Sequence, residues 1–222
     1  MTIKKIKAKD PGSAVTHFIG TLMAVFAATP LLLKAAASPG YIHILSLGIF
    51  ILSMILLYVA STIYHTLNIS SKINRRLKKF DHMMIYVLIA GTYTPICIIA
   101  LGGTSGYALL SIIWGLAIIG IIVTGFWINC PKWFSSVVYI AMGWICVLAF
   151  TQIINSLPTA AFIWLMAGGA IYTAGGVIYA LKLPIFNGRH KYFGSHEIFH
   201  LFVMGGSLCH FILMYNYIAV MP

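Results

Sequence analysis

Two pairs of polar residues in this 222-residue chain have a spacing that suits metal chemistry. Ser61 and His65 form one pair, and His196 and His200 form the other. Residues four positions apart share one face of an α-helix, because one helical turn rises about 5.4 Å. Three histidines with one open position are a known ligand set for catalytic zinc. The spacing makes His65, His196 and His200 candidate zinc ligands, provided that the fold brings them together.

Acidic residues are rare, and two of the three adjoin these histidines in the chain or in the expected fold. Asp81 stands at the start of an apolar run, and Glu197 lies between the two histidines of the second pair. A carboxylate beside a metal-bound water can orient that water and take its proton. We therefore interpret Asp81 as a catalytic residue, with the hydroxyl of Ser61 nearby.

The segment from His196 to His200 also matches the HExxH pattern of zinc metalloproteases, in which the glutamate is the general base. Glu197 points about 100° around the helix from His196, so we favour a supporting role in which its carboxylate caps the helix start. His17, near the start of the first apolar run, is a second candidate for support. Buried histidines with purely structural hydrogen bonds are the alternative for each residue taken singly.

Composition indicates which elements must position these residues. Hydrophobic residues make up 61% of the chain and charged residues only 8%, against about 45–50% and 25% in soluble domains. This excludes a soluble enzyme, a disordered chain and a nucleic-acid-binding domain, despite a formal charge of +11. A membrane-spanning helix needs about 20 mostly apolar residues. Seven runs of this kind predict an all-α protein with seven transmembrane helices in a single domain, near 13–36, 42–66, 82–101, 106–128, 134–155, 160–181 and 197–219.

The distribution of basic residues predicts the orientation of these helices. With seven spans, Lys34 lies on one side of the membrane and all other Lys and Arg residues lie on the opposite side. The positive-inside rule then puts the N-terminus in the cytoplasm and the C-terminus outside. His65, Asp81, His196 and His200 all fall at cytoplasmic span ends in this arrangement. A cleaved signal peptide is the alternative for the first span, but that run exceeds a typical signal-peptide core of 7–15 residues.

The connections carry fewer signals. We interpret the basic stretch from Ile69 to Phe80, in the connection 67–80, as a solvated cytoplasmic loop that attracts anionic lipid headgroups. Specific binding of a nucleotide or a partner is the alternative. Within the third span, the segment Gly91 to Pro95 predicts a kink, because proline removes a backbone hydrogen bond.

Three motifs together resemble those of the hemolysin III family. They are Ser61-x-x-x-His65, Phe80-Asp81 followed by Gly91-Thr92-Tyr93-Thr94-Pro95, and His196-x-x-x-His200. This family belongs to the progestin and adipoQ receptor superfamily, which is similar in turn to alkaline ceramidases. The resemblance covers essentially the whole chain. It implies zinc held by the three histidines, Asp81 on the zinc-bound water, Ser61 nearby, and a lipid-amide hydrolase activity.

The family's animal receptors carry a large cytoplasmic N-terminal domain that is not seen here, so we expect a bacterial-type, multi-pass protein of the plasma membrane. Two functions are compatible with the sequence. One is a zinc-dependent hydrolase of a lipid amide or ester, with a membrane lipid as its substrate. The other is non-enzymatic: a regulator of membrane homeostasis with a lipid as its ligand, or a pore-forming cytolysin. Few polar residues lie in the outer halves of the spans, which disfavours a water-filled pore.

Overall fold

The computed structural model describes residues 8–38, 40–181 and 193–222, and all secondary structure in these ranges is helical. Seven helical segments are long and apolar enough to cross a membrane, which confirms the predicted fold class. The helices are α1 (Pro11–Ala36), α2 (Ile42–Thr66), α3 (Ser71–Pro95), α4 (Gly103–Phe126), α5 (Lys132–Gly143), α6 (Phe150–Ser156), α7 (Thr159–Leu181) and α9 (Ser195–Asn216). Six of the basic residues used to predict orientation lie outside the described residues: Lys4, Lys5, Lys7, Lys182, Arg189 and Lys191.

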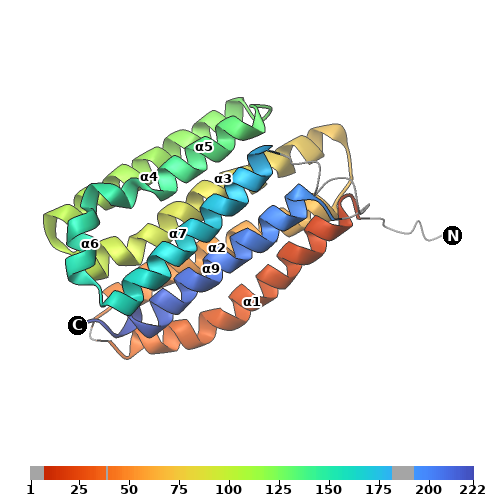
Figure 1. The fold of residues 1–222 in the computed structure, drawn as a ribbon. Coiled ribbons are helices and arrows are strands. Elements are labelled where there is room, and N and C mark those ends of the chain that lie inside the picture. Colours follow the sequence, from red (N-terminus) through yellow and green to blue (C-terminus); the bar gives the residue numbers. More distant parts are fainter. Residues whose placement is uncertain (1–7, 39, 182–192) are drawn as a thin grey trace.

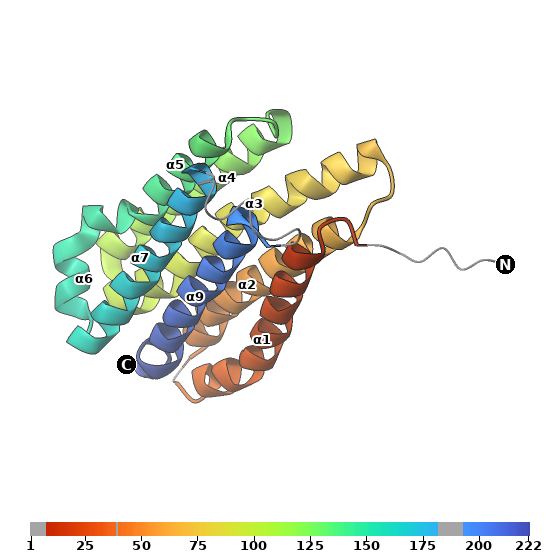
Figure 2. The same cartoon turned by 45° about the vertical axis from the view of Figure 1, so that its right-hand side comes forward.

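Six helices form a closed ring. Helix α1 packs on α2, α2 on α3, α3 on α5, α5 on α7, α7 on α9, and α9 on α1. Figures 1 and 2 show α1 beside α9, so the first and last long helices lie side by side. Helix α4 packs on the outside of α3. The outer faces are apolar, with Phe26 of α1 and Phe126 of α4 among the most exposed side chains, as expected for helices that face lipid.

The third helix begins at Ser71, not near residue 82, so most of the predicted loop 67–80 is helical. The hydroxyl of Ser70 accepts a hydrogen bond from the backbone N–H of Ile73 and caps the helix start. Lysine, arginine and leucine favour helices, so this basic segment extends α3 beyond the apolar span. The loop interpretation failed because hydropathy marks where a helix stays in lipid, not where it ends.

Two spans depart from a continuous α-helix. After Pro95, where the sequence predicts a kink, the third span continues as a π-helix (Ile96–Leu101), so the backbone leaves regular α-helical geometry at this proline. The fifth span, expected as one run, is broken at Gly143 and Trp144. A 3₁₀ segment (Ile145–Ala149) joins α5 to α6 at this point. The phenol of Tyr93 bridges the break, because it donates to the carbonyl oxygen of Gly143 at 2.6 Å and accepts from the N–H of Cys146 at 2.9 Å.

Candidate metal centre

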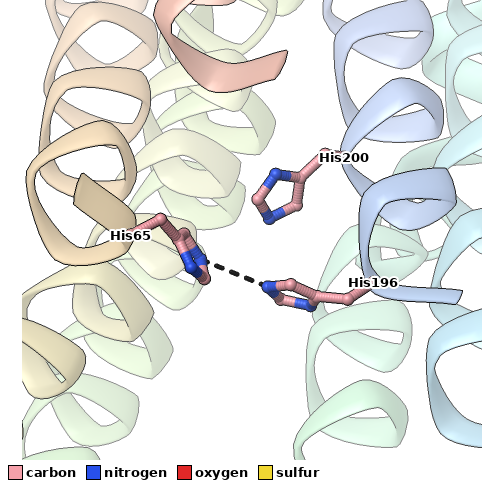
Figure 3. Close-up of side chains that lie close together, drawn as sticks. All are labelled: His65, His196 and His200. Atoms are coloured by element: carbon pink, nitrogen blue, oxygen red, sulfur yellow. Dashed lines mark hydrogen bonds between the residues drawn. The ribbon is translucent and has the colours of Figure 1, made fainter. Parts of the chain in front are cut away.

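Three histidines from two helices converge at one end of the bundle. Each of His65, His196 and His200 offers a ring nitrogen, and these three nitrogens all lie within 4.8 Å of one another. Figure 3 shows the rings of His196 and His200, one turn apart on α9, facing His65 on α2. Among the described residues, this is the only group of three or more His, Cys, Asp or Glu side chains close enough to hold a metal ion. The structure thus brings together the three ligands predicted from sequence.

One pair of ring nitrogens in the cluster has the spacing expected of two ligands on one ion. The Nε2 atoms of His65 and His196 are 3.2 Å apart. Two nitrogens bound tetrahedrally at the usual Zn–N distance would be separated by about 3.4 Å. The ring nitrogens of His65 and His200 also have little contact with solvent, because each residue is 2% exposed. The donor type, the spacing and the burial all fit a zinc ion.

Helix α1 orients two of these rings. The Nδ1 atom of His65 lies 3.0 Å from Oδ2 of Asp10, and Nδ1 of His200 lies 3.1 Å from Oγ1 of Thr16. The Thr16 hydroxyl donates to backbone carbonyl oxygens of its own helix, so it accepts from His200. Both rings then carry their proton on Nδ1 and present a free Nε2 lone pair to the cluster. A hydrogen bond of this kind behind the ring is typical of metal-bound histidine.

Asp10 and Thr16 were not identified from the sequence as residues that hold the histidine rings in place. Asp10 was one of only three acids, which was a signal that it needed a partner. It occupies the N-cap position of α1, but its carboxylate makes no cap bond and contacts His65 instead. Thr16 gave no such signal, because a lone threonine in an apolar helix is commonplace.

Glu197 lies where the capping interpretation put it. Its carboxylate accepts hydrogen bonds from the backbone N–H of Gly194 at 2.8 Å and from the hydroxyl of Ser13 at 2.5 Å. The first bond is half of a capping box at the start of α9, and the second joins α9 to α1. Both carboxylate oxygens therefore have structural partners.

Asp81 and Ser61 line a cavity of about 140 Å³ that reaches the histidine cluster. Asp81 is 7% exposed, and its Oδ2 lies 3.3 Å from Nδ1 of His82. Ser61 is 1% exposed, and its hydroxyl has no hydrogen-bond partner within the described part of the chain. His196 and His200 also line this cavity, so two of the proposed ligands and the two proposed catalytic residues face one space.

The cavity extends from the cluster toward the middle of the bundle. Its lining includes residues of α3 from Asp81 to Tyr93, a helical rise of about 18 Å. Every helix of the closed ring contributes to the lining, whereas α4 contributes none of the described lining residues. Away from the histidines, the wall of the cavity is mostly aliphatic and aromatic, with Leu88, Ile89 and Val203 among its residues. The space suits an apolar chain whose polar end lies against the histidines.

Comparisons with known proteins agree with the motifs. A family model described as "Haemolysin-III related" matches residues 6–211. A "Hemolysin-3 homolog" of Bacillus subtilis (strain 168) is 38% identical over 214 residues, which cover 96% of each chain. "Hemolysin-3" of Bacillus cereus is 35% identical over 211 residues, covering 95% of this chain and 92% of the relative. More distantly, an "Adiponectin receptor protein" of Drosophila melanogaster is 24% identical over 219 residues, which are 91% of this chain and 49% of the receptor. With seven membrane-spanning helices and matches that run along nearly its whole length, the chain belongs to the haemolysin-III related family, and it is a multi-pass protein of the cell membrane.

Proposed function

We propose that this protein is a zinc-dependent membrane hydrolase that cleaves an amide or ester bond of a lipid. The observation that carries the proposal is the convergence of His65, His196 and His200, with nitrogens within 4.8 Å, at the end of an elongated apolar cavity. Zinc held by these residues would supply Lewis-acid chemistry, polarising a carbonyl group and activating water.

The remaining residues have distinct roles in this proposal. Asp81, which faces the same cavity, orients the attacking water, accepts its proton and passes that proton to the leaving amine or alcohol as the bond to the carbonyl carbon breaks. The Ser61 hydroxyl, buried and without a protein partner among the residues described, donates a hydrogen bond to the carbonyl oxygen of the substrate. The apolar wall holds the acyl chain, which excludes bulk water from the reacting bond.

The cytoplasmic leaflet is the proposed source of the substrate. The cluster lies at the end of the bundle where α3 carries Lys72, Arg75, Arg76, Lys78 and Lys79 in its first turns. This basic end would face the cytoplasm and attract anionic headgroups. A lipid entering the cavity from that side would bring its polar part to the histidines first.

The name of the Bacillus cereus relative, Hemolysin-3, favours a second candidate function, in which this protein lyses membranes as a cytolysin without hydrolysing a lipid. One experiment separates the two. The purified protein in lipid nanodiscs is incubated with labelled N-acyl amide and acyl ester lipids, before and after metal removal by a chelator and after zinc is restored. Hydrolysis that disappears with the metal and returns with zinc supports the hydrolase. Lysis of dye-filled vesicles without any lipid cleavage would favour the cytolysin.

A further inference from the structure

A fourth histidine adjoins the cluster without belonging to it. His17 of α1 is 3% exposed, and its ring lies parallel to that of His200, with centroids 3.6 Å apart and planes 9° apart. Unlike His65 and His200, its ring has no hydrogen-bond partner among the described residues. Both of its ring nitrogens are buried and unpartnered in the ranges that the structure describes.

Neither aromatic ring that packs on His17 is a hydrogen-bond partner for its nitrogens. Ring nitrogens lie on the edge of an imidazole, so a face-to-face stack on His200 does not use them. The second ring against His17 belongs to Tyr58, at 5.1 Å, and the hydroxyl of Tyr58 is already bonded to Ser207 at 2.7 Å. His17 lines the same cavity as Ser61 and Asp81. A molecule in that cavity is therefore the group positioned to satisfy this ring.

The hydrogen-bonding chemistry narrows what that molecule can be. A neutral imidazole has one N–H donor and one lone-pair acceptor. Burying both without partners is costly, and proteins that retain such groups commonly use them at functional sites. An acyl chain alone offers neither a donor nor an acceptor, so the partner must be a polar group next to the chain.

We propose that His17 binds the polar group of the lipid in the cavity, by hydrogen bonds to the amide, ester or hydroxyl atoms at its junction with the acyl chain. This proposal rests on the proposed function, because it takes the cavity to be the lipid site. In this role, His17 selects lipids by their polar linkage and holds that linkage beside the metal ligands. Its stack on His200 fixes the ring for this contact.

Two fluorescent probes of equal chain length test the proposal. One is an alkyl urea, which keeps the carbonyl and N–H groups of an amide but resists hydrolysis. The other is the hydrocarbon analogue without the urea. Affinity for both is measured with the zinc-loaded wild type and with three variants in detergent. His17→Phe keeps a stacking ring without nitrogens, and His17→Gln keeps a donor and an acceptor without the ring. His43→Phe is the matched control. His43 is also buried, and its two ring nitrogens have no partner in the described part of the chain, but it is not among the residues that line the cavity.

We expect the His17→Phe variant to lose affinity for the urea probe only. His17→Phe should weaken urea binding by about 5–10-fold, the loss expected for one neutral hydrogen bond, and leave hydrocarbon binding unchanged. His17→Gln should recover part of that loss, and His43→Phe should match wild type. Zinc content and thermal unfolding, measured alongside, should be unchanged in His17→Phe.

Three results would overturn the proposal. If His17→Phe bound the urea as tightly as wild type, the ring nitrogens would not be needed for binding. If His17→Phe lost the same affinity for both probes, the role of His17 would be to pack the cavity wall and not to bind a polar group. Equal affinity of the wild type for urea and hydrocarbon would show that no polar group is bound there. None of these depends on turnover, so failure of the hydrolase proposal is detected separately, by the absence of zinc or of lipid cleavage.

Discussion

Asp10 and His65 are joined twice, although they belong to different helices. The carboxylate Oδ2 of Asp10 lies 3.0 Å from the Nδ1 atom of His65, and the backbone N–H of Asp10 donates to the carbonyl oxygen of His65 at 2.9 Å. The backbone bond holds the start of α1 against the end of α2. The side-chain bond places the imidazole proton on Nδ1, which leaves Nε2 free to bind a metal ion.

Asp10→Ala should therefore weaken zinc binding although Asp10 is not a ligand. Loss of a carboxylate behind a metal-bound histidine typically lowers affinity by about 10–100-fold. The measurement is a competition titration with a chromogenic chelator. Glu197→Gln is the control and should bind zinc as tightly as wild type, because the partners of Glu197 are Ser13 and Gly194. Equal zinc affinity in Asp10→Ala and wild type would contradict the orienting role.

The three proposed ligands predict how much zinc each chain binds, and that substitution of any one of them abolishes this binding. Wild type should hold about one zinc per chain, and His65→Ala, His196→Ala and His200→Ala should each lose it. Each of these variants should also unfold at a lower temperature, since the ion would join α2 to α9. Metal analysis and thermal unfolding in detergent provide the readouts. His43→Ala should keep the metal, and full zinc occupancy in His200→Ala would refute the assignment.

Asp81 and Glu197 should differ in their effect on turnover. Asp81→Asn should keep zinc but lose most hydrolysis of an N-acyl amide lipid, because the water then lacks its proton acceptor. Glu197→Gln should keep substantial activity and lose only about 1 kcal/mol of stability, the typical value of a helix cap. Lipid turnover and zinc content are measured on the same samples. An inactive Glu197→Gln beside an active Asp81→Asn would support the metalloprotease-like alternative instead.

The orientation of the bundle can be tested with reporters. A reporter fused after Pro222 should be external, and a tag inserted after Ser70 should be cytoplasmic, because the basic residues gather on the side of the Ser70 insertion. Paired enzyme fusions that are active on opposite sides of the membrane provide the measurement. Two reporters on the same side would mean that the number of crossings between them is wrong.

Two glycines of α4 form a matched pair for packing. A Cβ atom at Gly106 would overlap the carbonyl oxygen of Cys97, in the π-helical segment, whereas a Cβ at Gly115 would meet nothing within 4 Å. Gly106→Ala should destabilise the protein by about 1–3 kcal/mol, the usual range for overpacking. Gly115→Ala should be neutral or slightly stabilising, because alanine favours helices. Denaturation in mixed micelles compares the two, and equal stability would contradict the close approach.

The seven helices and the grouping of the three histidines could be predicted from the sequence for a physical reason. Apolar runs near 20 residues have few other stable forms, and polar residues at span ends are brought to one membrane depth by topology alone. The extension of α3 from Ser71 escaped prediction because its basic residues carry no apolar signal. The break at Trp144 escaped because neighbouring apolar residues give no hint of a 3₁₀ turn. Thr16 could not be recognised as a support, since its partner His200 is 184 positions away and only the packing of α1 on α9 brings them together.

The closed ring of helices has a consequence for how the protein is made. Asp10 and Thr16 are near the start of the chain, His65 follows on α2, and His196 and His200 lie on the last long helix. A ribosome synthesises about seven-eighths of the chain before it reaches His196 and His200, the second and third proposed ligands. At the proposed metal site, loading would therefore wait until membrane insertion is nearly finished. A chain that stops early, or whose last helix fails to insert, would keep the bond between Asp10 and His65 but lack two of the three proposed ligands. A bound ion would then mark a completed molecule.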